Sequence, residues 1–330
     1  ACGADPEELL GQRLGYTESQ GSPTLRARIA EQYPGCDADA VLVANAPMEA
    51  IAVAMQATLR PGSRVVVQTP CYQALLDIPR QLGCEVVPWP LLQVDTTFAI
   101  DWHMLEQHLA QPTDMVVTNF PHNPTGLHPQ AAQWERLSSW IERSGARWFS
   151  DEMYRGLERD TEEELPPAAS LNDKAISLWG LSKSFGLPGL RLGWLVSRDP
   201  ELLAAVETRK DFTSICTNAL SEYTGKLVLP HTRQICDSYR TLIGSNLERM
   251  AAFASRHPQT LTWHAPQAGP VGLCHVNQGT ASEMAERVRQ HDALLVPSRL
   301  FGLEDRWLRI GLGRADFEQG LQCWDRALST

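Results

Sequence analysis

Short apolar runs alternate with longer amphipathic segments through the middle of the chain. The longer segments space their apolar residues by three or four positions, which predicts helices over residues 49–59, 72–82, 101–109 and 130–143. The apolar runs predict strands at 41–44, 64–68, 85–88, 115–119, 147–150, 175–179 and 192–197. Strands that are apolar at successive positions are buried on both faces. The pattern therefore predicts an α/β fold in which helices cover both faces of a parallel sheet.

The pattern changes after about residue 200, where helical segments are followed by a different mixture. Helices are expected at 201–210, 222–257 (with a break at Pro230), 281–291 and from 316 onward, and strands at 261–264, 272–276, 293–296 and 307–311. This predicts a smaller α+β domain at residues 231–330, after a large domain at 36–230. Residues 1–35, with a helix at 22–33, are expected to return to the small domain or to a dimer interface.

Composition narrows the class of protein. The 330 residues include 29 Lys and Arg against 39 Asp and Glu, a net charge of -10, which disfavours nucleic-acid and anionic-membrane surfaces. Hydrophobic residues make up 43% of the chain, which excludes general disorder, and no apolar run approaches the ~18 residues of a spanning helix. The chain starts with Ala and lacks a signal-peptide pattern, so we expect a processed or truncated cytoplasmic chain.

The eight cysteines and nine histidines form neither a C-x-x-C pair nor a His/Cys cluster. Scattered single cysteines are typical of reduced thiols, which also favours a cytoplasmic location. No metal site is expected.

Polar and aromatic residues follow the predicted strands where these end. The segments that do so are Asn45-Ala-Pro-Met-Glu49, Thr69-Pro-Cys-Tyr72, Phe120-Pro-His-Asn-Pro-Thr-Gly126, Asp151-Glu-Met-Tyr154 and Gly180-Leu-Ser-Lys183. The carboxyl ends of parallel strands share one edge of a sheet, where ligands bind. Neither a G-x-G-x-x-G nor a P-loop pattern is present, which argues against dinucleotide and P-loop nucleotide binding.

One Lys among carboxylate, phenol, amide and guanidinium groups indicates a carbonyl cofactor held as a Schiff base. The Lys must be neutral to attack a carbonyl, and burial lowers its pKa. Pyridoxal phosphate needs an acid at its ring nitrogen, a ring-stacking side chain, donors to its phenolic oxygen, and an Arg with backbone amides for its phosphate. The residue types at this edge meet those needs.

The sequence resembles the fold-type I, class I and II pyridoxal-phosphate aminotransferases over nearly its whole length. The matching motifs are Tyr16-Thr-Glu-Ser-Gln-Gly21, Thr69-Pro-Cys-Tyr72, Asn119-Phe-Pro-His-Asn-Pro-Thr-Gly126, Ser150-Asp-Glu-Met-Tyr154, Leu181-Ser-Lys183 with Gly186-Leu-Pro-Gly-Leu-Arg191, and Trp307-Leu-Arg-Ile-Gly-Leu-Gly313. Each motif alone is weak, and their shared order and spacing carry the resemblance. The resemblance implies a three-layer α/β fold with a mixed, mostly parallel sheet.

The resemblance implies a role for each catalytic residue. Lys183 would form the Schiff base and move the proton, and Asp151 would pair with the pyridine nitrogen. Asn123 and Tyr154 would hydrogen-bond the phenolic oxygen. Arg309 would bind the substrate α-carboxylate, with Asn123 beside it.

The same resemblance implies the contacts that hold the cofactor. Tyr72 would stack on the ring. The phosphate would be held by Ser182, Arg191, the amides at Ala46 and Met48, and Tyr16 of a second subunit, which implies a homodimer.

Three departures from the family pattern stand out. Pro47 has no N–H and so removes one phosphate donor, and Gly180 stands where the family often has Ser. Looser cofactor retention is expected unless Ser182, Arg191 and Tyr16 compensate. Only a short piece precedes Tyr16, which puts closure of the site and full activity in doubt. His122 is interpreted as a loop histidine bonded to backbone, rather than as a substrate contact.

The cofactor residues do not choose the reaction. Transfer of the amino group of an L-amino acid to a 2-oxo acid is the first interpretation. The alternatives are a lyase or cyclase of the same fold, similar to the capreomycidine synthase subfamily, and a non-catalytic cofactor-binding domain, which the lack of a basic helix-turn-helix segment disfavours. Arg13, Arg26 and Arg155 are candidates for a side-chain carboxylate and are interpreted as surface charges.

Overall fold

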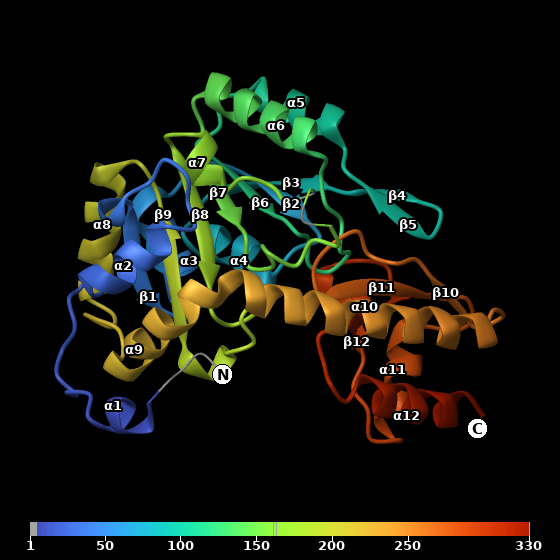
Figure 1. The fold of residues 1–330 in the computed structure, drawn as a ribbon. Coiled ribbons are helices and arrows are strands. Elements are labelled where there is room, and N and C mark those ends of the chain that lie inside the picture. The colour runs from blue at the N-terminus through green and yellow to red at the C-terminus, as the bar shows by residue number, and fades with distance from the viewer. Residues whose placement is uncertain (1–4, 161, 163, 330) are drawn as a thin grey trace.

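The fold of the chain is built around two main sheets, a large one and a small one (Figure 1). The computed structural model describes residues 5–160, 162 and 164–329. The first four residues of the predicted N-terminal segment, Cys2 among them, and the last residue of the predicted small domain lie outside the described residues.

The large sheet has seven strands in the order β1-β9-β8-β7-β6-β2-β3. Its strands are β1 (Val41–Asn45), β2 (Arg64–Thr69), β3 (Glu85–Pro90), β6 (Met115–Asn119), β7 (Arg147–Asp151), β8 (Ala175–Gly180) and β9 (Leu192–Val196). Only β9 runs against its two neighbours, β1 and β8. The predicted mixed, mostly parallel sheet is confirmed.

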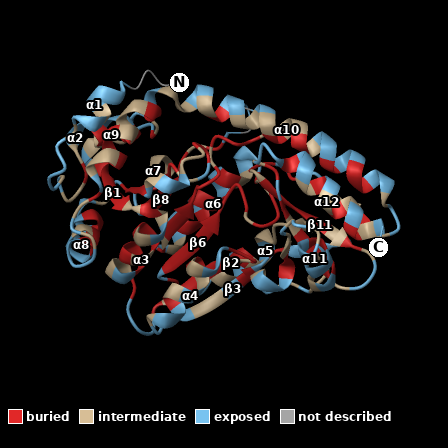
Figure 2. Cartoon of the chain, turned by 90° about the horizontal axis from the view of Figure 1, so that it is seen from below, coloured by how far each residue is buried: buried red, intermediate tan, exposed pale blue. Residues whose placement is uncertain are grey.

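Helices cover both faces of this sheet, because its strands are apolar at successive positions. On β2, Val65 and Val67 pack with one layer of helices, whereas Val66 packs with the other. The first layer is α3 (Ala46–Thr58), α4 (Gln73–Gln81) and α8 (Pro200–Asp211), and the second is α2 (Pro23–Ala30), α5 (Trp102–Leu109), α6 (Ala131–Ser144), α7 (Ala168–Leu171) and α9 (Ala219–Val228). Figure 2 shows the strands as the buried centre of these layers.

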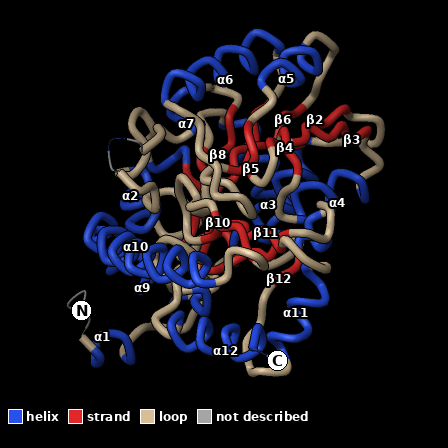
Figure 3. The backbone as a smooth tube through the Cα atoms, turned by 90° about the vertical axis from the view of Figure 1, so that its right-hand side faces the viewer, coloured by secondary structure: helices blue, strands red, loops and turns tan. Residues whose placement is uncertain are grey.

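The small sheet follows in the chain and is antiparallel, in the order β10-β11-β13-β12. Its strands are β10 (Leu261–Trp263), β11 (Val271–Val276), β12 (Val296–Pro297) and β13 (Trp307–Gly311), and its helices are α10 (Thr232–Arg256), α11 (Ala281–Arg289) and α12 (Phe317–Ser329). Apolar residues of these three helices form one core with the sheet. Figure 3 shows the helices around the strands of this sheet. Helix α10 runs from the large sheet to the small one (Figure 1).

Several elements differ from the sequence expectation. The strand expected at 293–296 begins only at Val296, because the Ala293 N–H still bonds to the Val288 carbonyl at the end of α11. A hairpin of β4 (Leu92–Val94) and β5 (Thr97–Ala99) was not expected, since its Asp95-Thr96 turn lacks the usual Gly or Asn. The short helix α1 (Pro6–Leu10) was also missed.

Part of the N-terminal segment packs on the large sheet. Leu25 and Ile29 of α2 are fully buried with strands β1 and β9, and the Trp194 indole donates to the Tyr33 hydroxyl at 3.0 Å. Helix α2 therefore packs on the large sheet rather than on the small one. A place for the rest of the segment in a dimer interface, and the domain boundaries at 35 and 230, stay predictions.

Within the part of the chain that the structure describes, no helix combines the length and apolarity needed to cross a membrane. The same residues form no group of three or more His, Cys, Asp or Glu side chains suited to a metal ion.

Candidate active site

Loops at the carboxyl edge of the large sheet bring the predicted catalytic residues together with one strand of the small sheet. Asp151 ends β7, and Lys183 lies just after β8. Arg309 comes from β13 and donates from Nη1 to Asn123 Oδ1 at 3.1 Å. Arg309 also affects the pKa values of both Lys183 and Tyr154, so these side chains share one electrostatic environment.

Asp151 is a buried carboxyl, with 4% of its surface exposed. Its Oδ1 accepts the Met153 N–H at 3.1 Å. Burial raises the pKa of Asp151 to about 7, while the Met153 N–H and the nearby Lys183 act in the opposite direction. A cation placed against this carboxyl would be stabilised strongly.

The pKa of Lys183 is lowered, first by burial and then by the positive charge of Arg309, whereas Asp151 raises it. A lowered pKa increases the fraction of neutral amine, which is the form that attacks a carbonyl and accepts a proton. The Lys183 carbonyl accepts the Gly186 N–H at 3.0 Å, which forms a turn just after the strand. The turn fixes the backbone from which the amine projects.

Tyr154 lies against a loop of the small domain. Burial raises its pKa to about 12, with Arg309 lowering and Asp151 raising it, so the phenol keeps its proton and serves as a donor. Gly269, at φ 76°, faces the ring: a Cβ there would stand 3.2 Å from Tyr154 Cδ2 and 3.4 Å from Pro121 Cβ. The positive φ favours glycine, and a Cβ would crowd both side chains.

Asn123 is held by its own loop. Its N–H donates to Asn119 Oδ1 at 2.9 Å, and Asn119 Nδ2 donates to the Asp151 carbonyl at 3.1 Å. Asn119 belongs to a sequence motif, but its role as a support for Asn123 is visible only in the structure.

His122 is fully buried behind this loop. Its ring nitrogens contact Pro70 O at 2.8 Å and Thr125 Oγ1 at 2.7 Å. Burial lowers its pKa to about 4. The interpretation of a loop histidine bonded to backbone is confirmed, with the Thr125 hydroxyl as a second partner.

Two supports around Arg309 were not foreseen. The guanidinium carbon lies 5.1 Å from the centre of the Phe301 ring, in the 3-10 turn η5 (Ser298–Phe301). Gln73 Nε2, at the start of α4, donates to the Leu300 carbonyl of that turn at 3.0 Å. Local sequence carries no signal for contacts between residues so distant in the chain.

The phosphate end of the site departs from the expectation at Ala46. Ala46 has φ 72°, and its N–H donates to the Arg191 carbonyl at 2.8 Å, so this amide already has a partner. Pro47 has no N–H. Of the amides expected to grip the phosphate, only that of Met48 is left, and its side chain is 38% exposed.

Pro47 and two glycines fill the space beside this helix start. A Cβ on Gly193 would lie 2.6 Å from Pro47 N and 2.8 Å from Pro47 Cδ. A Cβ on Gly180 would lie 2.8 Å from the Leu192 carbonyl oxygen and 3.0 Å from Pro47 Cγ. The Ser often found at this position in the family therefore has no room here.

The other predicted phosphate and ring contacts differ in exposure: the Ser182 hydroxyl oxygen is buried, whereas Arg191, Tyr72 and Tyr16 are exposed. Ser182 Oγ is buried and has no hydrogen-bond partner among the described residues. Arg191 is exposed, with Nη1 donating to the Pro188 carbonyl at 3.1 Å. Tyr72 is 44% exposed and its hydroxyl lies 3.6 Å from Met48 Sδ, whereas Tyr16 is 89% exposed.

Two of the three arginines considered for a side-chain carboxylate, Arg26 and Arg155, have structural partners. Arg26 donates to the Ala38 carbonyl at 2.8 Å. Arg155 is not a surface charge: its guanidinium carbon lies 4.7 Å from the ring centres of both Tyr33 and Trp179. Arg13 is exposed.

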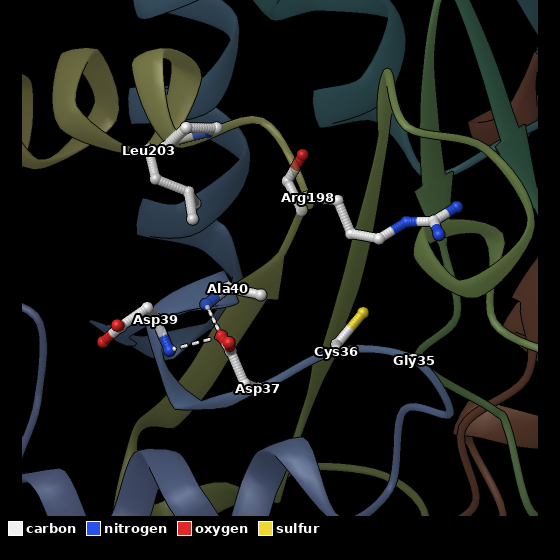
Figure 4. Close-up of a pocket in the computed structure, with 9 residues that line it drawn as sticks. Gly35, Cys36, Asp37, Asp39, Ala40, Arg198 and Leu203 are labelled. Carbon is white, nitrogen blue, oxygen red and sulfur yellow. Dashed lines mark hydrogen bonds between the residues drawn. The ribbon is translucent and has the colours of Figure 1, made fainter.

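A separate pocket lies at the opposite end of the strands (Figure 4). Cys36, Asp37 and Arg198 line it, and the Asp37 carboxylate accepts the N–H groups of Asp39 and Ala40 at 3.0 and 3.3 Å. Ala40 precedes β1 and the pocket's Ser197 follows β9, whereas the catalytic edge lies where β1 ends and β9 begins. The pocket is therefore not part of the candidate active site.

The family model for aminotransferase class I and II matches residues 4–319. The chain belongs to this family. Among its curated relatives, capreomycidine synthase of Streptomyces vinaceus is 30% identical over 316 residues, which cover 94% of this chain and 80% of that protein.

Solved structures of the family superpose closely on this aminotransferase-family chain. A PLP-dependent aminotransferase from Streptococcus suis has a TM-score of 0.91 at 26% identity, and a PLP-dependent cyclase, OrfR, has 0.88 at 30%. Each match covers 99% of this chain and 88% of the other. The fold-type I architecture is thereby confirmed.

Family membership implies pyridoxal phosphate as the cofactor, and the residues present fit it. The buried Asp151 suits a protonated ring nitrogen, and the Tyr154 phenol suits the phenolic oxygen. Ser182 Oγ, which has no hydrogen-bond partner among the described residues, and the exposed Arg191 suit the phosphate, and the Lys183 amine suits the carbonyl.

Proposed function

We propose that this protein is a pyridoxal-phosphate-dependent aminotransferase that moves the amino group of an L-amino acid to a 2-oxo acid through Lys183. The observation that carries the proposal is the place of Arg309. Its guanidinium, held by Asn123, shares one site with the Lys183 amine and the buried Asp151. When bound, the cofactor supplies an electron sink for the electrons released at the substrate α-carbon.

The protein side chains divide the remaining work. Arg309 binds and orients the substrate carboxylate, and its planar guanidinium suits a bidentate contact. Asp151 keeps the proton on the ring nitrogen. Lys183, with its lowered pKa, would take the proton from the substrate α-carbon and hold it for its return in the course of the transfer.

A second candidate is a cyclase or lyase of the same fold. The similarity to capreomycidine synthase and to the cyclase OrfR, both at 30% identity, favours it. The same residues would serve: Arg309 for the carboxylate and Lys183 for the α-proton. The reactions differ in what leaves the substrate afterwards.

The experiment follows the absorbance of the loaded protein during titration with L-amino acids, including arginine and hydroxyarginine. Formation of pyridoxamine phosphate together with a 2-oxo acid supports transamination. A cyclised or dehydrated product, with no 2-oxo acid and no need for an acceptor, supports the second candidate. A stable visible band that no amino acid changes supports a non-catalytic cofactor-binding domain. Lys183→Ala is the control and is expected to show neither the visible band nor turnover.

A homodimer and a cytoplasmic setting belong to the same proposal. The exposed Tyr16 side chain supports the first, since it is available to a second subunit. The cysteines support the second, because the seven in the described part of the chain are not in disulfides.

A further inference from the structure

The β4–β5 hairpin joins the large domain to the small one. It leaves the end of β3 and projects beyond the large sheet toward β10 and β11 (Figure 1). Its base is fixed on the large domain, where the Leu91 N–H donates to the Thr69 carbonyl at 2.8 Å and the Trp89 indole donates to the Asp101 carbonyl at 2.6 Å. These two hydrogen bonds to backbone carbonyls hold the base of the hairpin beside the large sheet.

The tip and one face of the hairpin contact the small domain. The Phe98 ring centre lies 5.3 Å from that of Trp307, with the planes tilted by 55°. Thr96 Oγ1 lies 2.6 Å from His264 Nε2. Trp307 is 1% exposed and also meets His275 edge-on at 5.3 Å, so three aromatic rings form a continuous stack.

This stack lies on the face of β13 that carries Arg309. Trp307 and Arg309 are two residues apart on the strand, so their side chains point to the same side. His275 is the cross-strand partner of Trp307 on β11. Phe98 therefore packs against the same strand, β13, that carries Arg309 and sets the position of its guanidinium.

We propose that the hairpin is a positioning element and Phe98 a positioning residue for substrate carboxylate recognition. By packing on Trp307, Phe98 holds β13 at the distance from the large domain at which Arg309 reaches Asn123. The inference rests on the proposed function, in which Arg309 binds the α-carboxylate. Phe98 itself touches neither substrate nor cofactor in this proposal.

A matched pair of small oxyamines tests this without knowledge of the natural amino acid. Aminooxyacetate and O-methylhydroxylamine are both reagents for the carbonyl group that pyridoxal phosphate would supply at Lys183, but only aminooxyacetate has a carboxylate. The ratio of their second-order rate constants, followed as loss of the visible band of the loaded protein, measures carboxylate recognition. Cofactor dissociation constants and thermal unfolding midpoints are measured alongside.

Phe98→Ala is expected to lower this ratio by about 2- to 10-fold, the range that loss of one aromatic pair gives. Phe98→Tyr should restore it, since the ring is kept. Val94→Ala is the matched control: Val94 lies on the same hairpin, pairs with Thr97, points to the other face and is 51% exposed. It should leave the ratio, the cofactor affinity and the unfolding midpoint unchanged.

A double-variant comparison separates positioning from general loss of packing. Arg309→Ala should remove most of the carboxylate preference, and adding Phe98→Ala to it should change nothing further, because Phe98 acts through Arg309. A wild-type ratio in Phe98→Ala, or a further drop in the double variant, would overturn the proposal. If Phe98→Ala does not fold, Phe98→Leu takes its place, and a wild-type ratio there is equally decisive.

The outcome for Arg309 tests the proposed function separately. An unchanged ratio in Arg309→Ala would refute the assignment of the carboxylate site, whatever Phe98 does. A reduced ratio in Arg309→Ala with no effect of Phe98→Ala would refute only the role of the hairpin.

Discussion

Asp151 makes the cofactor-free protein sensitive to pH. Its pKa is raised from the ordinary 3.8 to about 7, mainly by burial, so the folded state holds a proton that the unfolded chain has already lost. One pKa unit corresponds to about 1.4 kcal/mol, so ionising this carboxyl in the fold costs about 4 kcal/mol relative to the unfolded chain. Because 4% of Asp151 is exposed, solvent does little to reduce that cost.

The sign follows from proton binding. Between about pH 4 and pH 7 the folded state binds more protons at Asp151 than the unfolded state does, so the free energy of unfolding falls as pH rises through this window. Asp151→Asn removes the titration. Between pH 4 and pH 8 the free energy of unfolding should therefore fall by about 4 kcal/mol more in the wild type than in Asp151→Asn.

Urea unfolding of both cofactor-free proteins at several pH values measures this difference. Burial also raises the pKa of Glu158 to about 7. Glu158 titrates in both proteins, so its contribution cancels when their pH slopes are compared. A constant cost of the buried amide also cancels, since only the change with pH is compared. Identical pH slopes in the two proteins would refute the reasoning.

Loading with pyridoxal phosphate should act in the opposite direction. A protonated ring nitrogen beside Asp151 favours the carboxylate, so the wild-type slope should shrink on loading. Asp151→Asn should weaken cofactor binding by about 10- to 100-fold, as expected for loss of a hydrogen bond between charged groups.

Two more predictions concern the phosphate. The first uses a mixed dimer of one Tyr16→Ala subunit and one Lys183→Ala subunit. If Tyr16 acts across the interface, the site that keeps Lys183 receives an intact Tyr16 from the other subunit and should bind cofactor with wild-type affinity. Weakened binding at that site would place Tyr16 in its own subunit's site. Ser182→Ala should raise the cofactor dissociation constant by about 3- to 10-fold through loss of one hydrogen bond. Because Ser182 Oγ has no partner among the described residues, the unfolding midpoint of the cofactor-free variant should stay unchanged, and a lower midpoint would show that the hydroxyl has a structural role.

The order of elements was predictable because local pattern determines it. The apolar run at 64–68 became β2, since each of its valines meets a helix on one face or the other. The strand at 307–311 was found with its bounds intact. Hairpin β4–β5 was missed because its turn places Asp95 at φ 52° without the usual Gly or Asn, and tertiary contacts of Thr96 and Phe98 accompany it.

The sequence by itself determined the α/β plan, the family and which loops follow the strands at the carboxyl edge of the large sheet. Periodicity sets which faces are apolar, and parallel strands bring their following loops to one edge. The pKa values, positions and hydrogen bonds of the site residues could not be predicted from local sequence. The high pKa of Asp151 arises from burial, the fixed position of Arg309 from Asn123 and Phe301, and the loss of the Ala46 amide from the Arg191 carbonyl. Each depends on atoms that come together only when distant segments pack, so only the tertiary structure decided them.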